Sequence, residues 1–398
     1  MTKLSSIADY VTDKISSNDI ALREYVTTDC ILQNKKGREI ATNLPPQSCC
    51  LTCYQRGDVL IANIRPYLKK VWFADIDGGA SSDVLVFRAK EGHSPSFLYA
   101  VLLQDSFFDY VMQGAKGSKM PRGDKEQILR YEMPTLSCSE ESIGTFFLNL
   151  DQKIRLNEQI NQNLEAMAKQ LYDYWFVQFD FPNEEGKPYK SSGGEMLWND
   201  KLKRNIPVGW YCGNLFEIAV FTNGLACQKF RPKDDEVPLP VIKIREMHDG
   251  ISVDTGEVTS NIPESVKVYN GDVLFSWSAS LEVMLWAYGL GGLNQHIFKV
   301  TSANDFPKSF YYFQLLDYVD VFKKMAEARK TTMGHITQDH LQQSTIAIPD
   351  NKDIADKFEE LISPIFKQIV KLQEEISNLI KQRDELLPLL MNGQITIE

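Results

Sequence analysis

The sequence lacks the apolar segments and the cysteine pattern that membrane-bound and exported proteins carry. No apolar run among its 398 residues approaches the roughly 18 residues that a membrane-spanning helix needs. Residues 1–10 lack the apolar core that follows the basic start of a signal peptide. The seven Cys are an odd number, so we expect reduced thiols in a cytoplasmic protein without a membrane partner.

Metal ligands are also scarce, because the five His are scattered without the spacing of a ligand set. Cys49, Cys50 and Cys53 form one cluster that contains a C-x-x-C, and the nearest His is His93. A structural zinc site needs about four ligands, usually in two pairs, and the sequence holds no second pair. We therefore expect buried free thiols and no metal site, with zinc or redox chemistry as the alternative.

Known catalytic motifs are absent too. The sequence has no G-x-x-x-x-G-K, the usual motif of a P-loop motor. No G-x-G-x-x-G, the usual motif of a dinucleotide site, follows a predicted strand. Residues 43–46 have the wrong order for the Asn-Pro-Pro-aromatic box of amino-methyltransferases. Asp180 with residues 185–187 resembles a metal-nuclease pattern, but these residues lie in a Pro-flanked linker and not on paired strands. We expect no catalytic residue and no cofactor bound by this chain.

Long helical patterns are what the sequence does contain. In residues 143–176, which hold no Pro and only Gly144, apolar side chains recur at steps of three and four. A second such pattern covers residues 354–390, with a phase slip beside Pro364, where we expect a kink or a restart. We call the side chains predicted to face the partner helix the seam of each helix. The first seam consists of Ile143, Phe147, Leu150, Ile154, Asn157, Asn161, Leu164, Ala168, Leu171 and Trp175. The second seam consists of Ile354, Phe358, Leu361, Ile365, Ile369, Leu372, Ile376, Leu379, Arg383, Leu386 and Leu390. A buried Asn disfavours wrong helix registers, so Asn157 and Asn161 are predicted register residues.

The chain repeats its plan at a nearly constant offset. Residues 57–60 recur as 271–274 at an offset of 214, and Ile143 recurs as Ile354 at an offset of 211. This recurrence indicates internal duplication. We predict an α+β protein with two similar α/β globules and two long helices that pair as an antiparallel coiled coil with pseudo-twofold duplication. The predicted globules cover residues 1–141 and 206–350, the helices 142–180 and 351–398, and a polar linker 181–205.

Residues suited to DNA binding recur at equivalent places in both globules, although the net charge is −10. Such an acidic chain is unsuited to coating DNA without sequence preference, but a local basic face is compatible with it. The candidates are Asn63, Arg65, Lys116, Ser118, Lys119, Arg122 and Lys125 in the first globule, and Trp277, Asn294, Gln295, His296, Arg329, Lys330, Thr331, Thr332 and His335 in the second. Solvated charged loops and ordinary strand-end hydrogen bonding are the alternatives.

With these residues in place, the chain resembles the specificity subunits of type I restriction–modification enzymes. Residues 150–196 are similar to the central conserved region of that family, residues 206–210 to the entry of its second target-recognition domain, and residues 361–393 to its distal conserved region. The resemblance implies two target-recognition domains that each read half of a bipartite site in double-stranded DNA, held at a fixed separation by the helices.

The same resemblance implies partners and assigns all chemistry to them. The helices would dock two modification subunits, which methylate adenine N6 with S-adenosylmethionine, and two restriction subunits would supply the motor and nuclease with ATP and Mg. This chain would be non-catalytic. Two other interpretations are a coiled-coil adaptor whose globules bind protein partners, and an enzyme whose site carries no recognised motif.

Overall fold

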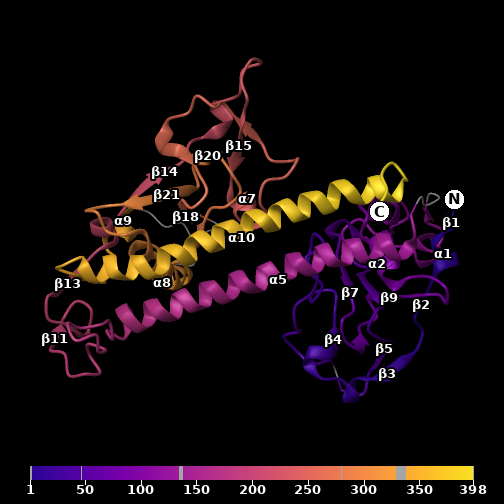
Figure 1. Ribbon diagram of the computed structural model, residues 1–398, viewed down its shortest axis with the longest axis horizontal. Coiled ribbons are helices and arrows are strands. Elements are labelled where there is room, and N and C mark those ends of the chain that lie inside the picture. The colour runs from indigo at the N-terminus through magenta and orange to yellow at the C-terminus, as the bar shows by residue number, and fades with distance from the viewer. Residues whose placement is uncertain (1, 46, 134–137, 279, 329–337, 398) are drawn as a thin grey trace. The chain divides into compact units, whose positions relative to one another are not determined.

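The computed structural model describes residues 2–45, 47–133, 138–278, 280–328 and 338–397 (Figure 1). The chain divides into two compact units, which we call the first unit (residues 1–155 and 379–398) and the second unit (residues 156–378). Two long helices, α5 (Glu140–Tyr172) and α10 (Asp353–Met391), contribute residues to both units. In the described part of the chain, no helix is both long and apolar enough to cross a membrane.

The first unit is centred on an antiparallel sheet whose two faces are both buried. The strand order is β2-β9-β6-β7, and β6 (Val59–Ala62) is buried throughout. Because successive strand residues point to opposite faces, Val59 and Ile61 pack with the helices, while Leu60 packs with Trp72 towards a second sheet of order β3-β5-β8-β4. The other elements are β1 (Thr2–Lys3), α1 (Leu4–Ile7), β2 (Ala8–Tyr10), β3 (Lys14–Ser16), η1 (Ser17–Asp19), η2 (Leu22–Glu24), β4 (Tyr25–Val26), β5 (Cys50–Tyr54), η3 (Pro66–Leu68), β7 (Val71–Phe73), β8 (Gly78–Ala80), β9 (Val84–Ala89), α2 (Pro95–Leu103), α3 (Asp105–Gln113), α4 (Lys125–Ile128) and β10 (Glu132–Met133).

The second unit also contains two four-stranded sheets, one of which has the same strand order as the central sheet of the first unit. The sheet β14-β21-β18-β19 is antiparallel, and β18 (Val273–Ser276) alternates in the same way between two cores. The second sheet has the order β16-β15-β20-β17. The other elements are β13 (Trp210–Gly213), α6 (Leu215–Ile218), β14 (Ala219–Asn223), η5 (Cys227–Lys229), β15 (Leu239–Ile242), α7 (Ile244–Asp249), β16 (Glu257–Val258), η6 (Glu264–Val266), β17 (Lys267–Val268), β19 (Glu282–Leu285), β20 (Gly291–Leu293), β21 (Ile297–Ser302), α8 (Lys308–Ala328), α9 (Gln338–Gln342) and β22 (Ile346–Pro349). The predicted α+β class is confirmed.

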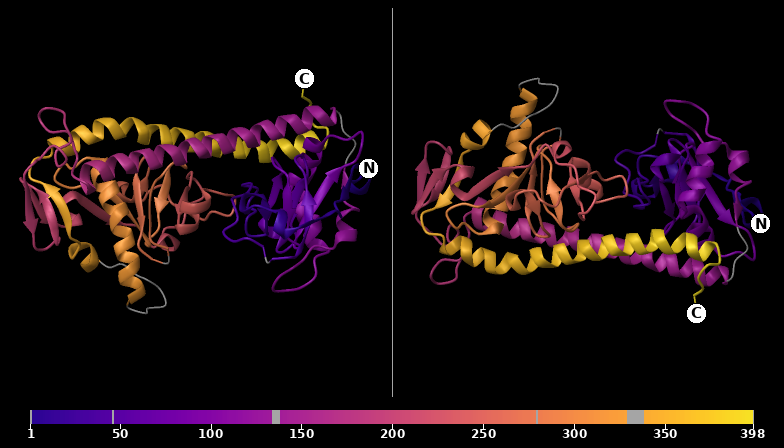
Figure 2. Two further views of the ribbon diagram at one scale, coloured as in Figure 1. Left: turned by 90° about the horizontal axis from the view of Figure 1, so that it is seen from below. Right: turned by 90° about the horizontal axis from the view of Figure 1, so that it is seen from above.

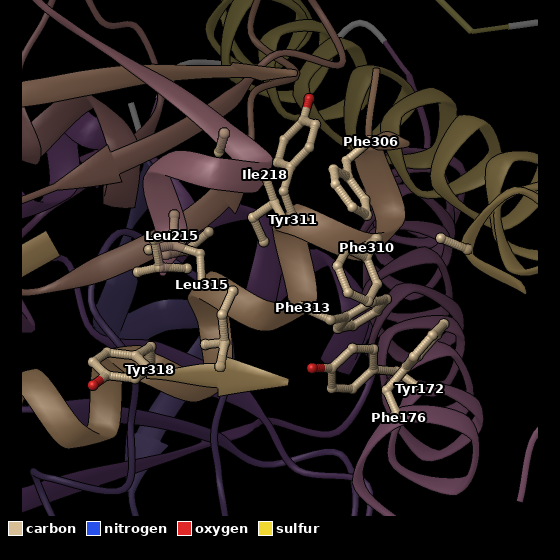
Figure 3. Packing of buried hydrophobic residues seen from close by; sticks show 14 of the residues in the cluster. Tyr172, Phe176, Leu215, Ile218, Phe306, Phe310, Tyr311, Phe313, Leu315 and Tyr318 are labelled. Atoms are coloured by element: carbon tan, nitrogen blue, oxygen red, sulfur yellow. The ribbon is translucent and has the colours of Figure 1, made fainter. Parts of the chain in front are cut away.

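An aromatic cluster joins the long helices to α8 in the second unit (Figure 3). The Tyr172 ring stacks on Phe313 at 5.1 Å, and Phe176 meets Phe310 edge-on at 5.0 Å. Phe358 on α10 contacts Phe176 from the other side at 5.0 Å. Aromatic pairs at these separations add to the stabilisation from burial, so the helices and this globule form one core.

The two long helices run antiparallel through the second unit, where they lie side by side in both views of Figure 2. Asn161 Nδ2 donates to the Ile369 carbonyl at 3.4 Å, and Tyr172 meets Phe358 at 6.1 Å. Moving 11 residues forward on α5, from 161 to 172, therefore corresponds to moving 11 residues back on α10, from 369 to 358. The coiled-coil geometry and the pseudo-twofold duplication stay predictions.

The predicted seam holds for α5 and fails in part for α10. Every predicted α5 seam residue is buried or half-buried, and Asn157 and Asn161 are both buried. On α10, however, Leu361 is 49% exposed and Ile362 is fully buried in its place. The helix also continues without a break through Pro364, because that residue is exposed and the hydrogen bond that it removes lies on the solvent side.

The segment predicted as a polar linker contains regular structure. After the π-helical turn η4 (Asp173–Val177), the strands β11 (Met196–Asn199) and β12 (Arg204–Pro207) pair as an antiparallel hairpin. Phe181 stacks between Tyr189 and Trp210 at 4.8 and 5.6 Å. These contacts anchor the segment to the second unit, so it is not a flexible tether.

A buried ionic network joins the two helices in the first unit. Arg383 Nη1 lies 3.1 Å from Asp151 Oδ1, and both side chains are almost completely buried. Tyr99 of α2 donates its hydroxyl to the other Asp151 oxygen, and Arg383 Nε bonds Asp384 at 3.1 Å. Burial opposes the charge of Arg383, but Asp384 and Asp151 together raise its pKa. Lys35 extends the network to Asp384 at 3.1 Å.

We predict that removing one partner of the Asp151–Arg383 pair lowers the free energy of unfolding more than replacing both partners with apolar residues. Asp151→Ala removes the buried carboxylate from Arg383 and leaves it only the partly exposed Asp384, so the free energy of unfolding should fall by up to about 3–5 kcal/mol. The double variant Asp151→Leu with Arg383→Met should lose less than the single variant. Chemical denaturation of the two variants measures both values. Glu385→Ala, which removes the exposed Lys381–Glu385 pair on the same helix, should change stability by only about 0–1 kcal/mol. Equal losses in all three would contradict a special role for the buried pair.

Candidate nucleic-acid interface

In the first unit, residues predicted to bind DNA come from two loops and meet at one edge of the central sheet, where β6 ends and β9 begins. Pairing of Ala62 with Val84 sets the end of β6 beside the start of β9. Asn63 follows β6, and its N–H donates to the Asp83 carbonyl at 2.9 Å. The edge is a firm platform because the strands behind it are buried on both faces.

The basic loop of residues 114–124 is hydrogen-bonded across this edge. Arg65 N donates to the Pro121 carbonyl at 2.8 Å, and Asn63 Nδ2 donates to Gly123 O at 3.3 Å. Lys116 and Arg122 exchange backbone hydrogen bonds of 3.0 and 2.9 Å, so the loop is a small hairpin. Ser118 and Lys119 lie exposed at its tip, and Lys125 begins α4 just beyond it. The structure thus brings the seven first-unit candidates to adjoining loops.

Two residues around η3 adopt a left-handed backbone. Arg65 has φ +53° and Lys69 has φ +50°, on either side of Pro66 and Tyr67. Such conformations cost of order 1 kcal/mol each for residues with a side chain, and they persist where the surroundings determine them. The hydrogen bond from Arg65 to the 114–124 loop is one such determinant. Strain of this kind is common at binding sites.

The charges at this edge are mainly positive. Arg65, Lys119 and Lys125 are exposed and have no ion pair among the described residues. Lys116 pairs with Asp124 at 2.8 Å, and this contact holds the pKa of the Asp124 carboxyl below its usual range. Arg122 pairs with Asp83 at 3.1 Å. A phosphate group could therefore be met by three unpaired cations and two partly neutralised ones.

Two exposed side chains at this edge escaped the sequence reasoning. Tyr67 is 50% exposed beside Arg65, and Met120 is 51% exposed at the hairpin tip. An exposed aromatic ring beside cations suits stacking on a base or packing against a sugar. A sequence signal existed, because Tyr67 stands between Arg65 and Lys69, but the left-handed turn that exposes it carries no Gly to reveal it.

In the second unit, Trp277, Asn294, Gln295 and His296 meet at the equivalent sheet edge. Trp277 follows β18, its N–H donates to the His296 carbonyl at 3.3 Å, and the two rings are 5.7 Å apart. Trp277 Nε1 also reaches Asn223 Oδ1 at 3.4 Å. Gln295 Nε2 lies 3.3 Å from His296 Nε2. These side chains offer amide, imidazole and aromatic groups where the first unit offers cations.

Asn294 supports this group from behind. It is only 8% exposed, and its Oδ1 accepts from the His296 N–H at 3.4 Å. Gly224 permits the close approach of the neighbouring strand end, since a Cβ there would lie 2.2 Å from the Asn294 carbonyl oxygen. Asn294 therefore positions His296, and Gln295 and His296 are the more accessible side chains. The candidates Arg329, Lys330, Thr331, Thr332 and His335 lie outside the described residues.

The cysteine cluster is less buried than predicted. Cys50 is exposed at the start of β5, and Cys49 and Cys53 are half-buried, because only Leu51 and Thr52 of this stretch face the core fully. All seven thiols are free. Among the described residues, no group of three or more His, Cys, Asp or Glu is arranged to hold a metal ion.

Several known proteins are similar to this chain in sequence. Residues 207–382 match the family model of the type I restriction modification DNA specificity domain. The chain is 23% identical over 397 residues to the type I restriction enzyme MjaIX specificity subunit of Methanocaldococcus jannaschii, covering 96% of this chain and 87% of that protein. It is 23% identical over 441 residues to the HindI specificity subunit of Haemophilus influenzae, covering 93% and 94%.

A solved structure shares the fold over the full length. The type I restriction-modification S subunit from M. genitalium aligns with a TM-score of 0.60 and 11% identity, covering 100% of this chain and 96% of that one. At this level of identity the likeness shows a shared fold. Residues 207–382 thus match a type I restriction modification DNA specificity domain, and nearly the whole chain is similar in sequence to type I restriction enzyme specificity subunits.

We predict that the exposed cations of the first unit act on DNA backbone charge. Arg65→Gln and Lys119→Gln should each weaken DNA binding several-fold and lower the slope of log affinity against log salt by about 1. Fluorescence anisotropy across a salt series measures both effects on the assembled complex. Lys3→Gln, which removes an exposed charge from β1, is the matched control. An unchanged slope in both variants would remove these residues from the interface.

Proposed function

We propose that each unit reads one half of a bipartite site in double-stranded DNA. The observation that carries the proposal is the recurrence of polar constellations at the same edge of two sheets with matching strand order. Asn63 and Asp83 flank the β6–β9 edge, and Trp277 and His296 flank the β18–β21 edge. Residues 1–141 and 206–350 are the proposed target-recognition domains.

The two constellations suit different contacts with DNA. Arg65, Lys119 and Lys125 can bind phosphates, and Arg side chains can also bind guanine edges. Gln295 suits an adenine edge, because a carboxamide can donate and accept at once. We further propose that Arg329, Lys330, Thr331, Thr332 and His335 belong to the second domain's contact surface. The two domains would accordingly recognise unlike half-sites.

The helices are the proposed spacer. Residues 142–180 and 351–398 would pair as an antiparallel coiled coil and hold the two readers at a set distance, with residues 181–205 as the connection. At ~1.5 Å per residue, a helix the length of α5 spans about 50 Å, roughly one and a half turns of B-DNA at ~34 Å per turn. Two readers joined in this way act at high effective concentration, so neither half needs to bind tightly alone.

The helices also offer a docking face for partner subunits. Leu156, Ile160 and Met167 on α5 and Leu361 on α10 are apolar and between 37% and 56% exposed. Residues four and seven apart lie on one face of a helix, so the three α5 side chains form a stripe. We propose that this face binds two modification subunits. The modification subunits would use S-adenosylmethionine to methylate adenine N6, and two restriction subunits would use ATP and Mg. This chain would bind no cofactor.

Footprinting separates this function from its alternative, a coiled-coil adaptor whose globules bind protein partners. The chain assembled with its modification subunits should protect two short DNA segments separated by a fixed, less specific gap, and protection should weaken steeply with salt. An adaptor would give no discrete protected site at any salt concentration. One continuous protected segment would equally overturn the bipartite reading.

We predict that the two readers are independent. Gln295→Ala combined with His296→Ala should relax base preference in one half-site and leave the other half-site unchanged, because the side chains touch only one half. Selection from randomised DNA measures both preferences together. Arg65→Gln is the reciprocal control, since any change in its preference should fall in the opposite half. A change in both half-sites from either variant would contradict independence.

The buried asparagines should enforce the spacer register. Asn157 Nδ2 and Asn161 Oδ1 have no hydrogen-bond partner within the described residues. We predict that Asn157→Leu and Asn161→Leu keep the protein folded and broaden the range of gap lengths that it accepts, because apolar seams tolerate slippage. Binding to DNA series with gaps one base pair longer or shorter tests this. An unaltered gap preference would count against a register role.

A further inference from the structure

A cavity of about 630 Å³ lies within the second unit, and Trp277, Gln295 and His296 are not part of its lining. Its walls come from α5, α8, β19 and α10, together with residues 287 and 288 after β19. Gln162, Glu165 and Ala166 on the α5 wall are exposed, so the cavity opens to solvent on that side. Its volume is in the range of sites that bind small molecules.

The lining combines aromatic rings with carboxylates. Tyr312 and Phe366 meet edge-on at 5.1 Å, and Tyr288, whose hydroxyl accepts from Gln373 Nε2 at 3.2 Å, forms a further wall. Glu165 from α5 and Glu282 from β19 bring negative charge from two different walls. Rings of this kind attract organic cations through their faces, while carboxylates bind the N–H groups.

Lys169, the one cationic side chain among the described residues of the lining, is already neutralised. Lys169 lies 2.9 Å from Asp317 Oδ1 and also pairs with Asp173. Glu165, by contrast, has no ion pair among the described residues, and desolvation raises the pKa of its carboxyl. Glu282 Oε2 lies 3.2 Å from His248 Nε2, an ion pair only when that imidazole is protonated. The cavity therefore carries net negative charge.

A buried acceptor in the cavity wall, Asn161 Oδ1, has no donor among the described residues. Asn161 is only 7% exposed and its Nδ2 is used at the Ile369 carbonyl, so Oδ1 is the polar atom that it offers to the cavity. That oxygen has no hydrogen-bond partner among the described residues. Leaving a buried acceptor without a partner is unfavourable, so a ligand that donates to Asn161 Oδ1 is favoured.

We propose that this cavity binds a linear aliphatic polyamine. Its ammonium groups would donate to Glu165, Glu282 and Asn161, and its methylene segments would lie against Tyr312 and Phe366. A hydrated divalent metal ion fits less well, because it needs several oxygen ligands in a fixed geometry and gains little from aromatic walls. The occupant would connect both long helices to β19 and α8 of the same unit, and its binding needs neither DNA nor partner subunits.

Spermidine titrated into the purified full-length chain at constant ionic strength tests the proposal. We expect saturable heat of binding and a concentration-dependent rise in the unfolding midpoint. Neutral 1,8-octanediol and magnesium chloride are the comparison probes, and neither should match spermidine. An equal response to magnesium would mean general charge screening and would overturn the site, as would the absence of saturable binding.

Substitutions in the lining test whether spermidine binds in this cavity. Glu282→Gln and Glu165→Gln should each weaken spermidine affinity roughly ten-fold or more, because each removes a charge-assisted hydrogen bond. Glu360→Gln, the same change at an exposed α10 position outside the lining, should leave the affinity unchanged. Ala166→Trp fills the cavity mouth from an exposed helix position and should abolish binding without unfolding the protein. Unchanged affinity in the two carboxylate variants and Ala166→Trp would place the amine elsewhere and overturn the proposal.

Discussion

The buried pair of Asp151 and Arg383 is the contact that fixes how the two long helices meet in the first unit. A charge in the core must be met by an opposite charge at one position, whereas apolar seam residues can slide past one another. Tyr99 and Lys35 tie the same network to α2 and to the loop before β5, so the globule is attached to the helices through directional bonds. In the second unit, the helices meet through the hydrogen bond from Asn161 to Ile369 and through the aromatic cluster around Phe358. The contact surface between the helices is therefore mainly apolar and includes a few polar contacts.

The candidate sites depend on this attachment because they lie at the edges of sheets packed on the helices. At each edge, a strand pair buried on both faces ends in residues whose backbone bonds are satisfied, and the side chains are left for a ligand. The first edge is cationic and includes a left-handed turn at Arg65, while the second combines an indole, an imidazole and carboxamides. Equivalent positions with unlike chemistry are what two readers of different half-sites require. The match of residues 207–382 to a DNA specificity domain agrees with a DNA-binding role for the second edge.

Much of this architecture could be predicted from local pattern, and what escaped prediction depends on distant contacts. The α5 seam and the recurrence of residues 57–60 follow from periodicity, which the sequence displays directly. Arg383 stands in the predicted apolar seam, but nothing local shows that Asp151, 232 residues away, neutralises it. On α10, Ile362 is buried at the place that the sequence predicted for Leu361. Which of these two neighbours faces the core depends on how the helix is rotated near Pro364, and the packing partner decides that rotation. Tyr67 and the hairpin of β11 and β12 were missed for a related reason. Backbone bonds from Arg65 to Pro121 and strand pairing from Met196 to Pro207 are invisible in composition.

The central claim is that one chain carries two separate readers of a split DNA sequence. Sequencing of methylated adenines in DNA modified by the complex of this chain with its modification subunits tests it most directly. The account predicts modified adenines in one composite motif, made of two unlike short half-sites separated by a constant number of unspecified base pairs. A single uninterrupted motif, or a gap that varies freely from site to site, would contradict it.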